Sequence, residues 1–285
     1  MPQLLAKGVL ILVFLALILG ASAQEPGRAG VKPQRVASIN LCADQLLLAL
    51  ADRDQIASLS PLVRDESISF LAGEARGLPT NPGNGEAILF SRADLVLAGR
   101  YDPQARLALL QDQGLDVMVL EPWRSLQQGR EQIRALARRL GHPARGERLI
   151  ESIDAALARA DGIAPRGRSI LVYHRRGWVP AAQSVTNEIL AHMGFASHQE
   201  TLGLPRGGLA RLESIVQSPP DYALVDEVGG GNIDQGSALL AHPALIKAIP
   251  PERRLAIPSR LLICGGPSTP AAIDALAGEA REKAR

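Results

Sequence analysis

The chain has 285 residues, a formal net charge of +2, two cysteines and only 3% aromatic residues. Such a charge balance gives no electrostatic reason to expect nucleic acid or an anionic membrane surface as a partner, and two cysteines exclude a disulfide-rich scaffold. The length is sufficient for two domains of roughly 100 to 150 residues, each with its own core.

The first residues have the pattern of an export signal. Lys7 precedes the apolar run 9–19, and Ala21-Ser22-Ala23 then forms a cleavage site for a signal peptide at residues 1–23. The run is shorter than the roughly 18 to 20 residues that span a bilayer, although an uncleaved anchor is the alternative. Residues 24–34, rich in Pro and Gly, are expected to be a flexible lead. We therefore expect a soluble protein exported to a bacterial periplasm.

From residue 35 onward, β-rich runs alternate with helical patterns. We predict strands at 35–40, 55–60, 94–98, 116–120, 169–174, 222–226 and 255–257. We predict helices at 44–51, 103–113, 125–140, 143–162, 186–193, 209–217, 243–249 and 269–283. This alternation is typical of α/β domains whose mainly parallel sheets are covered on both faces.

Two segments of the chain are nearly alike. Glu86–Leu97 and Glu213–Leu224 carry Glu, Ile, Ser, Asp and Leu at matching offsets, and Gly-Leu-Pro precedes each at Gly77 and Gly203. A repeat of this period predicts two related lobes, at 35–142 and 163–285. The helix at 143–162 lies between them and is expected to act as a rigid bridge. Two lobes imply a cleft, where ligands commonly bind.

Ligands of open parallel sheets bind outside the carboxyl ends of the strands, so the residues that follow each strand are the candidate site. Three aromatic residues, Tyr101, Trp123 and Trp178, and six arginines, Arg64, Arg100, Arg124, Arg175, Arg176 and Arg260, occupy these positions. We predict ligand contact for the aromatic residues and for these arginines other than Arg124. The aromatic rings favour a flat or partly apolar ligand, and guanidinium groups favour carboxylates and other oxyanions. The alternative is that the rings pack under their own loops and the arginines pair with neighbouring acids.

Cys42 and Cys264 each follow a predicted strand, one in each lobe. An oxidising compartment would permit a disulfide, but a cleft held by a rigid helix is expected to keep the two Cα atoms beyond the limit of roughly 7 Å. The sequence therefore favours unpaired, packed cysteines. A disulfide, or a metal site shared with His174, is the alternative.

Enzyme signatures are scarce. The sequence has no phosphate-binding Gly-x-x-x-x-Gly-Lys-Ser/Thr loop, no His-Glu-x-x-His and no Gly-x-Ser-x-Gly. We therefore predict no enzyme, no catalytic cofactor and no metal centre. Two alternatives remain: a periplasmic metal chelatase with His174 as the cleft base, and a module that senses its ligand and signals to a membrane receptor.

The exported start, the strand Val36–Asn40, the two Glu-containing segments and the long helix between them together resemble the periplasmic binding proteins for iron-siderophores and vitamin B12. The resemblance covers the chain from about Arg35 to the C-terminus. It implies two Rossmann-like lobes joined by a single long rigid α-helix, with a shallow cleft that changes little on binding.

The resemblance also implies a function and its residues. The protein would be a monomeric substrate-binding subunit that delivers its ligand to the permease dimer of an ABC importer, and Glu86 and Glu213 stand where the family's docking glutamates stand. The alternative for both is that they complement a helix dipole. The arginine-rich rim favours a ferric siderophore or related metal chelate, with cobalamin or haem as the alternative ligand. The two cysteines depart from the family pattern.

Overall fold

A computed structural model describes residues 32–226 and 238–284, which form one compact unit. The predicted signal peptide, residues 1–23, and residues 24–31 of the lead lie outside the described residues. Within the described part of the chain, no helix combines the length and the apolar character needed to cross a membrane.

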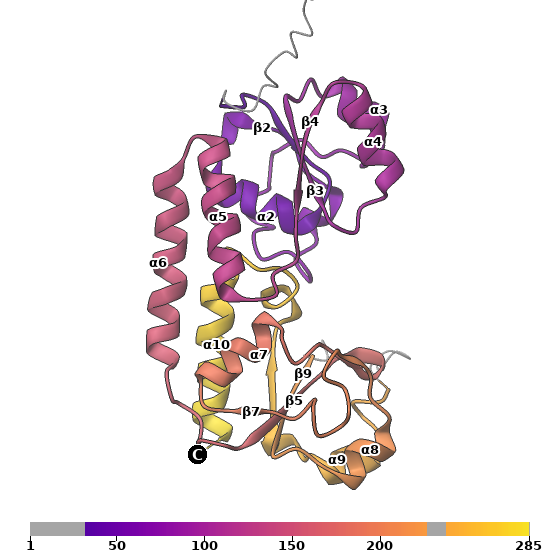
Figure 1. Ribbon diagram of the computed structural model, residues 1–285, viewed down its shortest axis with the longest axis vertical. Coiled ribbons are helices and arrows are strands. Elements are labelled where there is room, and N and C mark those ends of the chain that lie inside the picture. The colour runs from indigo at the N-terminus through magenta and orange to yellow at the C-terminus, as the bar shows by residue number, and fades with distance from the viewer. Residues whose placement is uncertain (1–31, 227–237, 285) are drawn as a thin grey trace, which may run out of the picture. The chain divides into compact units, whose positions relative to one another are not determined.

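The first lobe is built on a four-stranded parallel sheet (Figure 1). Its strands are β1 (Val36–Ser38), β2 (Ile56–Ser58), β3 (Leu95–Gly99) and β4 (Asp116–Leu120), in the order β2-β1-β3-β4. Its helices are α2 (Leu41–Leu50), α3 (Gly85–Phe90), α4 (Gln104–Asp112) and α5 (Leu126–Leu140). The two central strands β1 and β3 are wholly buried, as expected for a parallel sheet covered on both faces.

The second lobe has a parallel sheet of its own. Its strands are β5 (Ser169–Tyr173), β7 (Ala196–Ser197), β9 (Tyr222–Asp226) and β10 (Arg254–Ile257), in the order β10-β9-β5-β7. The lobe also contains a short antiparallel pair, β6 (Trp178–Val179) with β8 (Gly208–Leu209). Both strands lie between β5 and β9 in the chain. The helices are α7 (Val185–His192), α8 (Leu212–Gln217), α9 (Pro243–Ala248) and α10 (Thr269–Lys283).

The repeated sequence has the same structural role in both lobes. Written from the second strand of each lobe, the sheets run β2-β1-β3-β4 and β7-β5-β9-β10, which is the same topology. Asp94 accepts backbone hydrogen bonds from Gln34 and Arg35 at the start of β1, at 2.7 and 3.1 Å. Asp221 accepts from the backbone N–H of Ser169 at the start of β5, at 2.8 Å. In each lobe the repeated aspartate thus fastens the first strand to the third.

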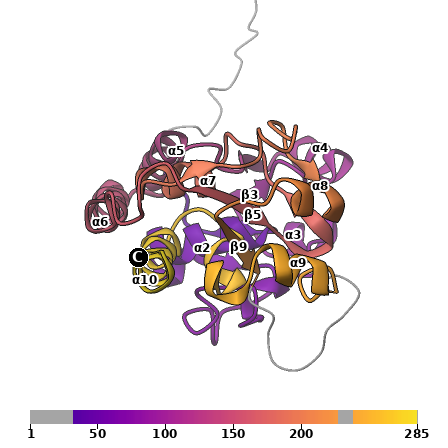
Figure 2. The same cartoon turned by 90° about the horizontal axis from the view of Figure 1, so that it is seen from below.

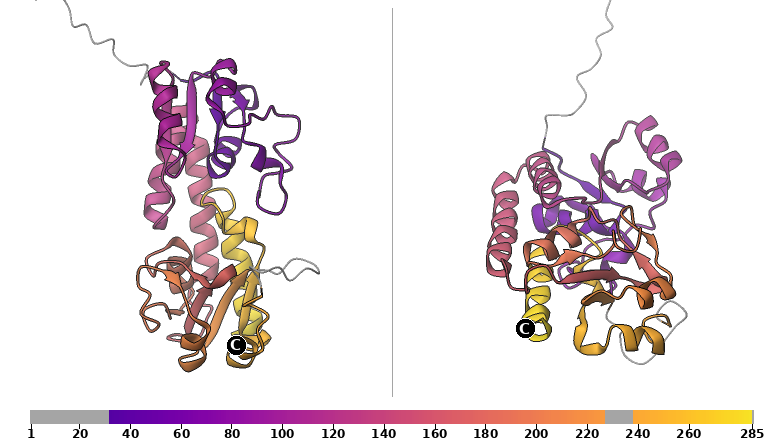
Figure 3. Two further views of the ribbon diagram at one scale, coloured as in Figure 1. Left: turned by 90° about the vertical axis from the view of Figure 1, so that its right-hand side faces the viewer. Right: turned by 60° about the horizontal axis from the view of Figure 1, so that its bottom comes forward.

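The predicted bridging helix is α6 (Pro143–Ala160). It packs against α5 and α10, and these helices lie side by side in Figures 1, 2 and 3. Arg134 pairs with Glu147 at 2.9 Å between α5 and α6, and Arg159 pairs with Asp274 at 2.8 Å between α6 and α10. Gly141, with φ 81°, forms the left-handed turn that ends α5, a conformation that glycine adopts without steric cost.

One hydrophobic cluster runs through both lobes. It contains Leu46 and Leu136 from the first lobe, Ile153 from α6, and Leu224 and Ile273 from the second. The structure therefore confirms the predicted fold class of two parallel-sheet lobes joined by a long helix, and it adds a continuous core along that helix.

Local differences from the predicted elements have identifiable causes. Helix α2 begins at Leu41 and not at Asp44, because the Asn40 side chain caps it by accepting from Cys42 N at 3.0 Å. Leu209, predicted to begin a helix, instead pairs with Trp178 in the β6–β8 ribbon, and α8 begins at Leu212. Strands β6, β7 and β8 have two residues each and leave too short a pattern to be read from the sequence.

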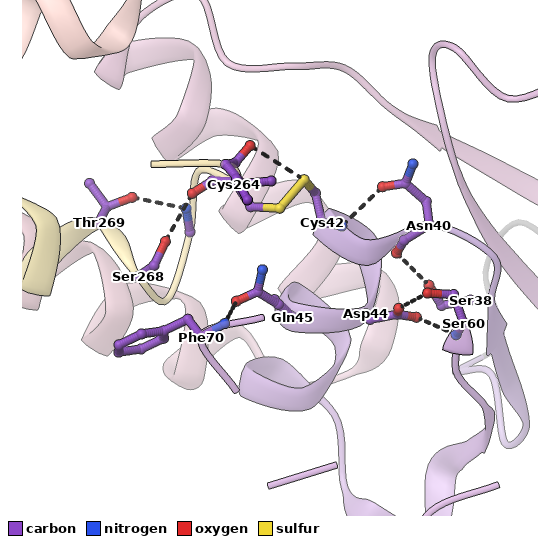
Figure 4. Close-up of a disulfide and its surroundings, with 12 residues drawn as sticks. Ser38, Asn40, Cys42, Asp44, Gln45, Ser60, Phe70, Cys264, Ser268 and Thr269 are labelled. Carbon is purple, nitrogen blue, oxygen red and sulfur yellow. Dashed lines mark hydrogen bonds between the residues drawn. A yellow bond between two sulfur atoms is a disulfide. The ribbon is translucent and has the colours of Figure 1, made fainter. Parts of the chain in front are cut away.

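The two cysteines are bonded to each other, so the expectation of unpaired cysteines was wrong. The Cys42–Cys264 disulfide has a Cα–Cα distance of 5.2 Å, within the range that a disulfide requires. The rigid bridge does not hold the cysteines apart, because the chain between β10 and α10 reaches back to α2 (Figure 4). The pairing also removes the alternative of a metal site shared by these thiols and His174.

Candidate functional site

A cavity of about 340 Å³ lies at the carboxyl ends of β1, β3 and β4. Its lining comes from both lobes: Asn40, Cys42, Leu46, Arg100, Tyr101, Leu120, Glu121, Pro122, Trp123, Gln132, Val185, Leu262, Ile263, Cys264 and Gly265. The size is within the range of about 300 to 1,000 Å³ usual for small-molecule sites. The position is the one that parallel sheets offer to ligands.

A tight turn after β3 places Tyr101 at the cavity. The Asp102 carboxylate accepts from Gly99 N at 2.6 Å, and Asp102 N donates to Gly99 O at 3.1 Å, which fixes the turn. Tyr101 at its tip is 88% exposed. The neighbouring Arg100 guanidinium lies 3.8 Å from the Glu121 carboxylate, so the charge of this arginine is partly balanced within the cavity lining.

Trp123 forms part of the lining and is largely packed. A Cβ on Gly129 of α5 would lie 2.4 Å from its ring, and a Cβ on Gly265 would lie 2.3 Å from it. Both distances are below any real contact, so the indole occupies the space that these two glycines leave open. The indole Nε1 is buried and has no hydrogen-bond partner. Trp123 therefore packs under its own loop and also lines the cavity, so the two alternatives considered from the sequence both apply to it.

The disulfide is also part of the lining (Figure 4). Cys42 comes from the first turn of α2, while Cys264 lies between β10 and α10. Cys264 is 5% exposed, and Cys42 is partly exposed. Residues 262–265, named the wall segment below, thus form one side of a cavity that is otherwise lined by the first lobe and by Val185 of α7.

A set of buried polar residues surrounds Asp44 and the ends of β1 and β2. The Asp44 carboxylate of α2 accepts hydrogen bonds from Ser60 N at 3.0 Å and from the Ser60 hydroxyl (Figure 4). Asn81 donates to Ser38 O at 3.0 Å and to the Ser58 hydroxyl at 2.8 Å. Burial raises the pKa of Asp44 to about 6, because it disfavours the charged form more than the serine hydrogen bonds favour it.

Of the eight predicted ligand-binding residues, the structure brings three to this cavity, Arg100, Tyr101 and Trp123. The other five do not appear in its lining: Arg64, Arg175, Arg176, Trp178 and Arg260. All five are exposed, and Arg64 donates to Leu78 O at 2.8 Å. Arg176 has φ 59°, uncommon for a residue with a side chain. Contact of these five with a ligand stays a prediction.

Several lining residues carried no signal in the sequence. Leu46 and Val185 look like ordinary helix residues, and Ile263 and Gly265 follow the short turn after β10. The Gly265-Gly266 pair was the one available clue, because consecutive glycines often mark close approach of the backbone to another group. Here that group is the first lobe: a Cβ on Gly266 would lie 2.9 Å from Leu46.

A second cavity has a volume of about 490 Å³, and some of its lining residues are next in the chain to lining residues of the first cavity. It is lined by Arg124, Ser125, Ala182, Gln183, Ser184, Asn187, Glu188, Ala191 and Ser197. Glu188 of α7 accepts from Leu126 N at the start of α5, at 2.7 Å. Arg124 and Ser184 directly follow and precede the lining residues Trp123 and Val185 of the first cavity, so the loops that form both cavities are shared.

Glu86 and Glu213 lie away from both cavities. Each is exposed and occupies the second position of a short helix, α3 in the first lobe and α8 in the second. Neither side chain makes a hydrogen bond or ion pair with another described residue. Among the described residues, moreover, no group of three or more His, Cys, Asp or Glu side chains is gathered as a protein metal site requires.

The sequence of residues 36–261 matches the family model for periplasmic binding proteins. The chain belongs to the periplasmic binding protein family. Its members are binding proteins and not enzymes, so the chelatase alternative is set aside. No curated protein matches the sequence of this binding protein.

Solved structures of similar fold cover nearly the whole of this binding protein. One is the periplasmic heme-binding protein RhuT from Roseiflexus sp. RS-1, with a TM-score of 0.69, 22% identity and coverage of 88% of this chain and 99% of that one. Another is a periplasmic heme-binding protein from Pseudomonas aeruginosa, with a TM-score of 0.70, 20% identity and coverage of 89% of this chain and 94% of that one. A third is the vitamin B12-binding protein BtuF from Vibrio cholerae, with a TM-score of 0.62, 16% identity and coverage of 87% of this chain and 96% of that one. At these identities the likeness establishes a shared fold.

Proposed function

We propose that this protein is the periplasmic substrate-binding subunit of an ABC importer and that it carries a metal chelate of the flat tetrapyrrole class, such as haem or a corrinoid. The observation that carries the proposal is the inter-lobe cavity at the carboxyl ends of β1, β3 and β4, with Tyr101 exposed at its edge. Membership of the periplasmic binding protein family and structural neighbours that bind heme or vitamin B12 support it.

The lining of the cavity favours a tetrapyrrole over the ferric siderophore expected from the sequence. The siderophore expectation rested on a rim of six arginines, but only Arg100 among them lines this cavity, and Glu121 lies beside it. Arg124 lines the second cavity. Val185, Leu262 and Ile263 instead present aliphatic surface. A flat, largely apolar ring system gains from such a lining, whereas a strongly anionic chelate needs more cationic donors than the cavity supplies.

Tyr101 is the lining side chain best suited to contact the metal. A tyrosine phenolate is an established axial ligand of ferric haem. The ring is free to be covered, and the Arg100 guanidinium in the same lining is suited to pair with a propionate of the ligand. We therefore assign metal contact to Tyr101 and carboxylate contact to Arg100.

Absorption titrations test the ligand class. The purified protein is titrated with haemin, with cyanocobalamin and with a ferric hydroxamate siderophore, and native mass spectrometry gives the stoichiometry. We expect saturable binding of a tetrapyrrole at micromolar concentration or below, and no binding of the siderophore. Binding of the siderophore alone would refute the proposed ligand class.

A substitution tests the assigned contact. Tyr101→Phe keeps the ring but removes the oxygen, so it is expected to abolish the phenolate-to-iron absorption band and to weaken haemin binding. Tyr222→Phe is the matched control, because Tyr222 lies on β9 with its ring packed edge-on against Phe195 at 5.6 Å, away from the cavity lining. An unchanged spectrum in Tyr101→Phe would contradict the role of Tyr101.

Glu86 and Glu213 are proposed to dock on the permease. They occupy equivalent helices of two lobes with the same topology, so they present two similar acidic points to a partner made of two similar subunits. Exposed apolar side chains lie on the same helices, Phe90 at 85% and Val216 at 42% exposure. An acidic point beside apolar surface is suited to a partner patch that contains arginine.

The docking proposal is tested with the reconstituted importer. The Glu86→Ala/Glu213→Ala double variant is expected to lose stimulation of the transporter ATPase while its ligand affinity stays that of the native protein. Glu151→Ala is the control, because Glu151 is an exposed glutamate on α6. Lost ligand affinity in the double variant, or native stimulation of the ATPase, would contradict the docking role.

A further inference from the structure

We propose that the Cys42–Cys264 disulfide is a functional part of the binding site. It holds the wall segment, residues 262–265, against the first lobe, so that ligand binding and the oxidation state of the two cysteines are coupled. The inference deepens the proposed function and rests on it for the place where the ligand binds.

The wall segment is attached to the first lobe, although the elements on either side of it in the chain belong to the second lobe. It follows β10 and precedes α10, which pack on one another, yet it lies on the first lobe. Gly265 contacts the Trp123 ring, Gly266 contacts Leu46, and Cys264 is bonded to Cys42 of α2. One side of the cavity is thus supplied by a segment whose neighbours in the chain, β10 and α10, belong to the second lobe.

Apart from the disulfide, the hydrogen bonds that this region makes with other described residues are internal. Leu262 N and Ile263 N donate to Ser259 O at 2.9 and 3.1 Å, Ser268 Oγ donates to Cys264 O at 2.9 Å, and Gly266 N donates to the Thr269 hydroxyl at 3.0 Å. These hydrogen bonds shape the turn but do not attach it to the first lobe. Cys42 Sγ lies 3.8 Å from Ile263 O, a contact that the disulfide itself brings about, since a bonded sulfur has no proton to donate.

The disulfide therefore provides the specific attachment. Without it, van der Waals packing of two glycines on Trp123 and Leu46 remains, and such packing tolerates sliding. Ile263, which lines the cavity and is 46% exposed, would move with the segment. The distance between the Ile263 side of the cavity and the Tyr101 side is then no longer fixed, and a rigid ligand loses part of its contact surface.

Coupling must act in both directions. Both cysteines line the cavity, and Cys42 is the more exposed of the two, so an occupant covers the sulfur that a reductant would attack. If oxidation of the cysteines strengthens ligand binding, ligand binding must stabilise the disulfide by the same factor. The disulfide thus sets both the shape of the site and its dependence on thiol redox state.

The first experiment measures reduction of the native protein by dithiothreitol, followed by mass spectrometry after thiol alkylation. Each disulfide takes up two electrons and two protons to give two thiols, while the reagent's dithiol closes to its own disulfide. Zinc protoporphyrin IX is the probe, because its metal is not reduced by dithiols. We expect saturating probe to raise about tenfold the ratio of reduced to oxidised dithiothreitol at which half of the protein is reduced, within the range usual for coupled sites. An unchanged ratio with the probe bound would overturn the proposal.

The second experiment compares probe affinity in the oxidised protein, the reduced protein and the Cys42→Ser/Cys264→Ser variant. The reduced protein and the variant are expected to bind about tenfold more weakly. Reoxidation of the reduced protein should restore affinity, which separates loss of the disulfide from irreversible unfolding. Equal affinity in the oxidised and reduced states would overturn the proposal.

A third measurement needs no ligand and keeps the two proposals distinguishable. Amide hydrogen exchange of residues 262–266 in the ligand-free protein is compared before and after reduction. Exchange about tenfold faster on reduction is expected, and the α10 amides serve as the internal control. If no tetrapyrrole binds, the proposed function fails while this result still decides the disulfide's role, and unchanged exchange would refute that role.

Discussion

Replacing Asp44 by asparagine is expected to remove a pH dependence of stability that the native protein carries. Asp44 is fully buried, and burial raises the pKa of its carboxyl from 3.8 to about 6. The folded state therefore binds a proton that the unfolded state has lost between pH 3.8 and 6. Stability must fall as the pH rises through this interval. At 1.36 kcal/mol per pKa unit, the full fall is about 3 kcal/mol.

The asparagine amide has nearly the same shape and no charge at any of these pH values. We expect the free energy of unfolding of Asp44→Asn to equal that of the native protein near pH 3.5. At pH 7 we expect it to be higher than that of the native protein by up to about 3 kcal/mol. The assay is urea unfolding at intervals from pH 3.5 to 7.5, with the disulfide left oxidised. Parallel pH profiles for the two proteins would refute the reasoning, and so would a growing advantage of the native protein toward pH 7.

Two further substitutions test interactions described above. Asp221→Asn should have the opposite sign of pH dependence, because hydrogen bonds from Ser169 lower the pKa of Asp221. In urea unfolding the variant should lose about 2 kcal/mol at pH 7 and progressively less below pH 3.8, and a pH-independent loss would contradict this. Gly265→Ala places a Cβ 2.3 Å from the Trp123 ring and should cost about 1 to 3 kcal/mol in thermal unfolding while weakening zinc protoporphyrin binding. Its control is Gly278→Ala in α10, where no atom lies within 4 Å of the new Cβ; stability there should rise by about 0.5 to 1 kcal/mol, and equal effects at the two glycines would contradict the packing argument.

The sequence was sufficient for the fold because periodicity and repetition act over whole elements. The apolar positions of α6 and α10 predicted both helices to within two residues, and β4 was predicted at its observed bounds. The matching Glu, Ile, Ser, Asp and Leu residues reflected a real equivalence. Ile88 and Ile215 are both fully buried, and Asp94 and Asp221 fasten equivalent strands.

The candidate site was predicted less completely, because its composition depends on tertiary contacts. Strand-end reasoning found Arg100, Tyr101 and Trp123, all on the first lobe. It included the segment 259–264 after β10 but did not single out Ile263, because nothing local indicates that this part of the chain crosses to the other lobe. The same crossing explains the error over the cysteines, since distance was judged from the lobes to which they were assigned and not from the path of the wall segment.

The disulfide also imposes an order of events on biosynthesis. Cys42 precedes its partner by 222 residues. Synthesis at about 5 to 20 residues per second separates the appearance of the two thiols by roughly 10 to 40 s. During that interval most of the first lobe is complete, but the segment that covers Cys42 does not yet exist. Cys42 must therefore avoid forming a disulfide with any other thiol until nearly the whole chain has been synthesised. Helix α10 can take its final position only after both lobes have been synthesised.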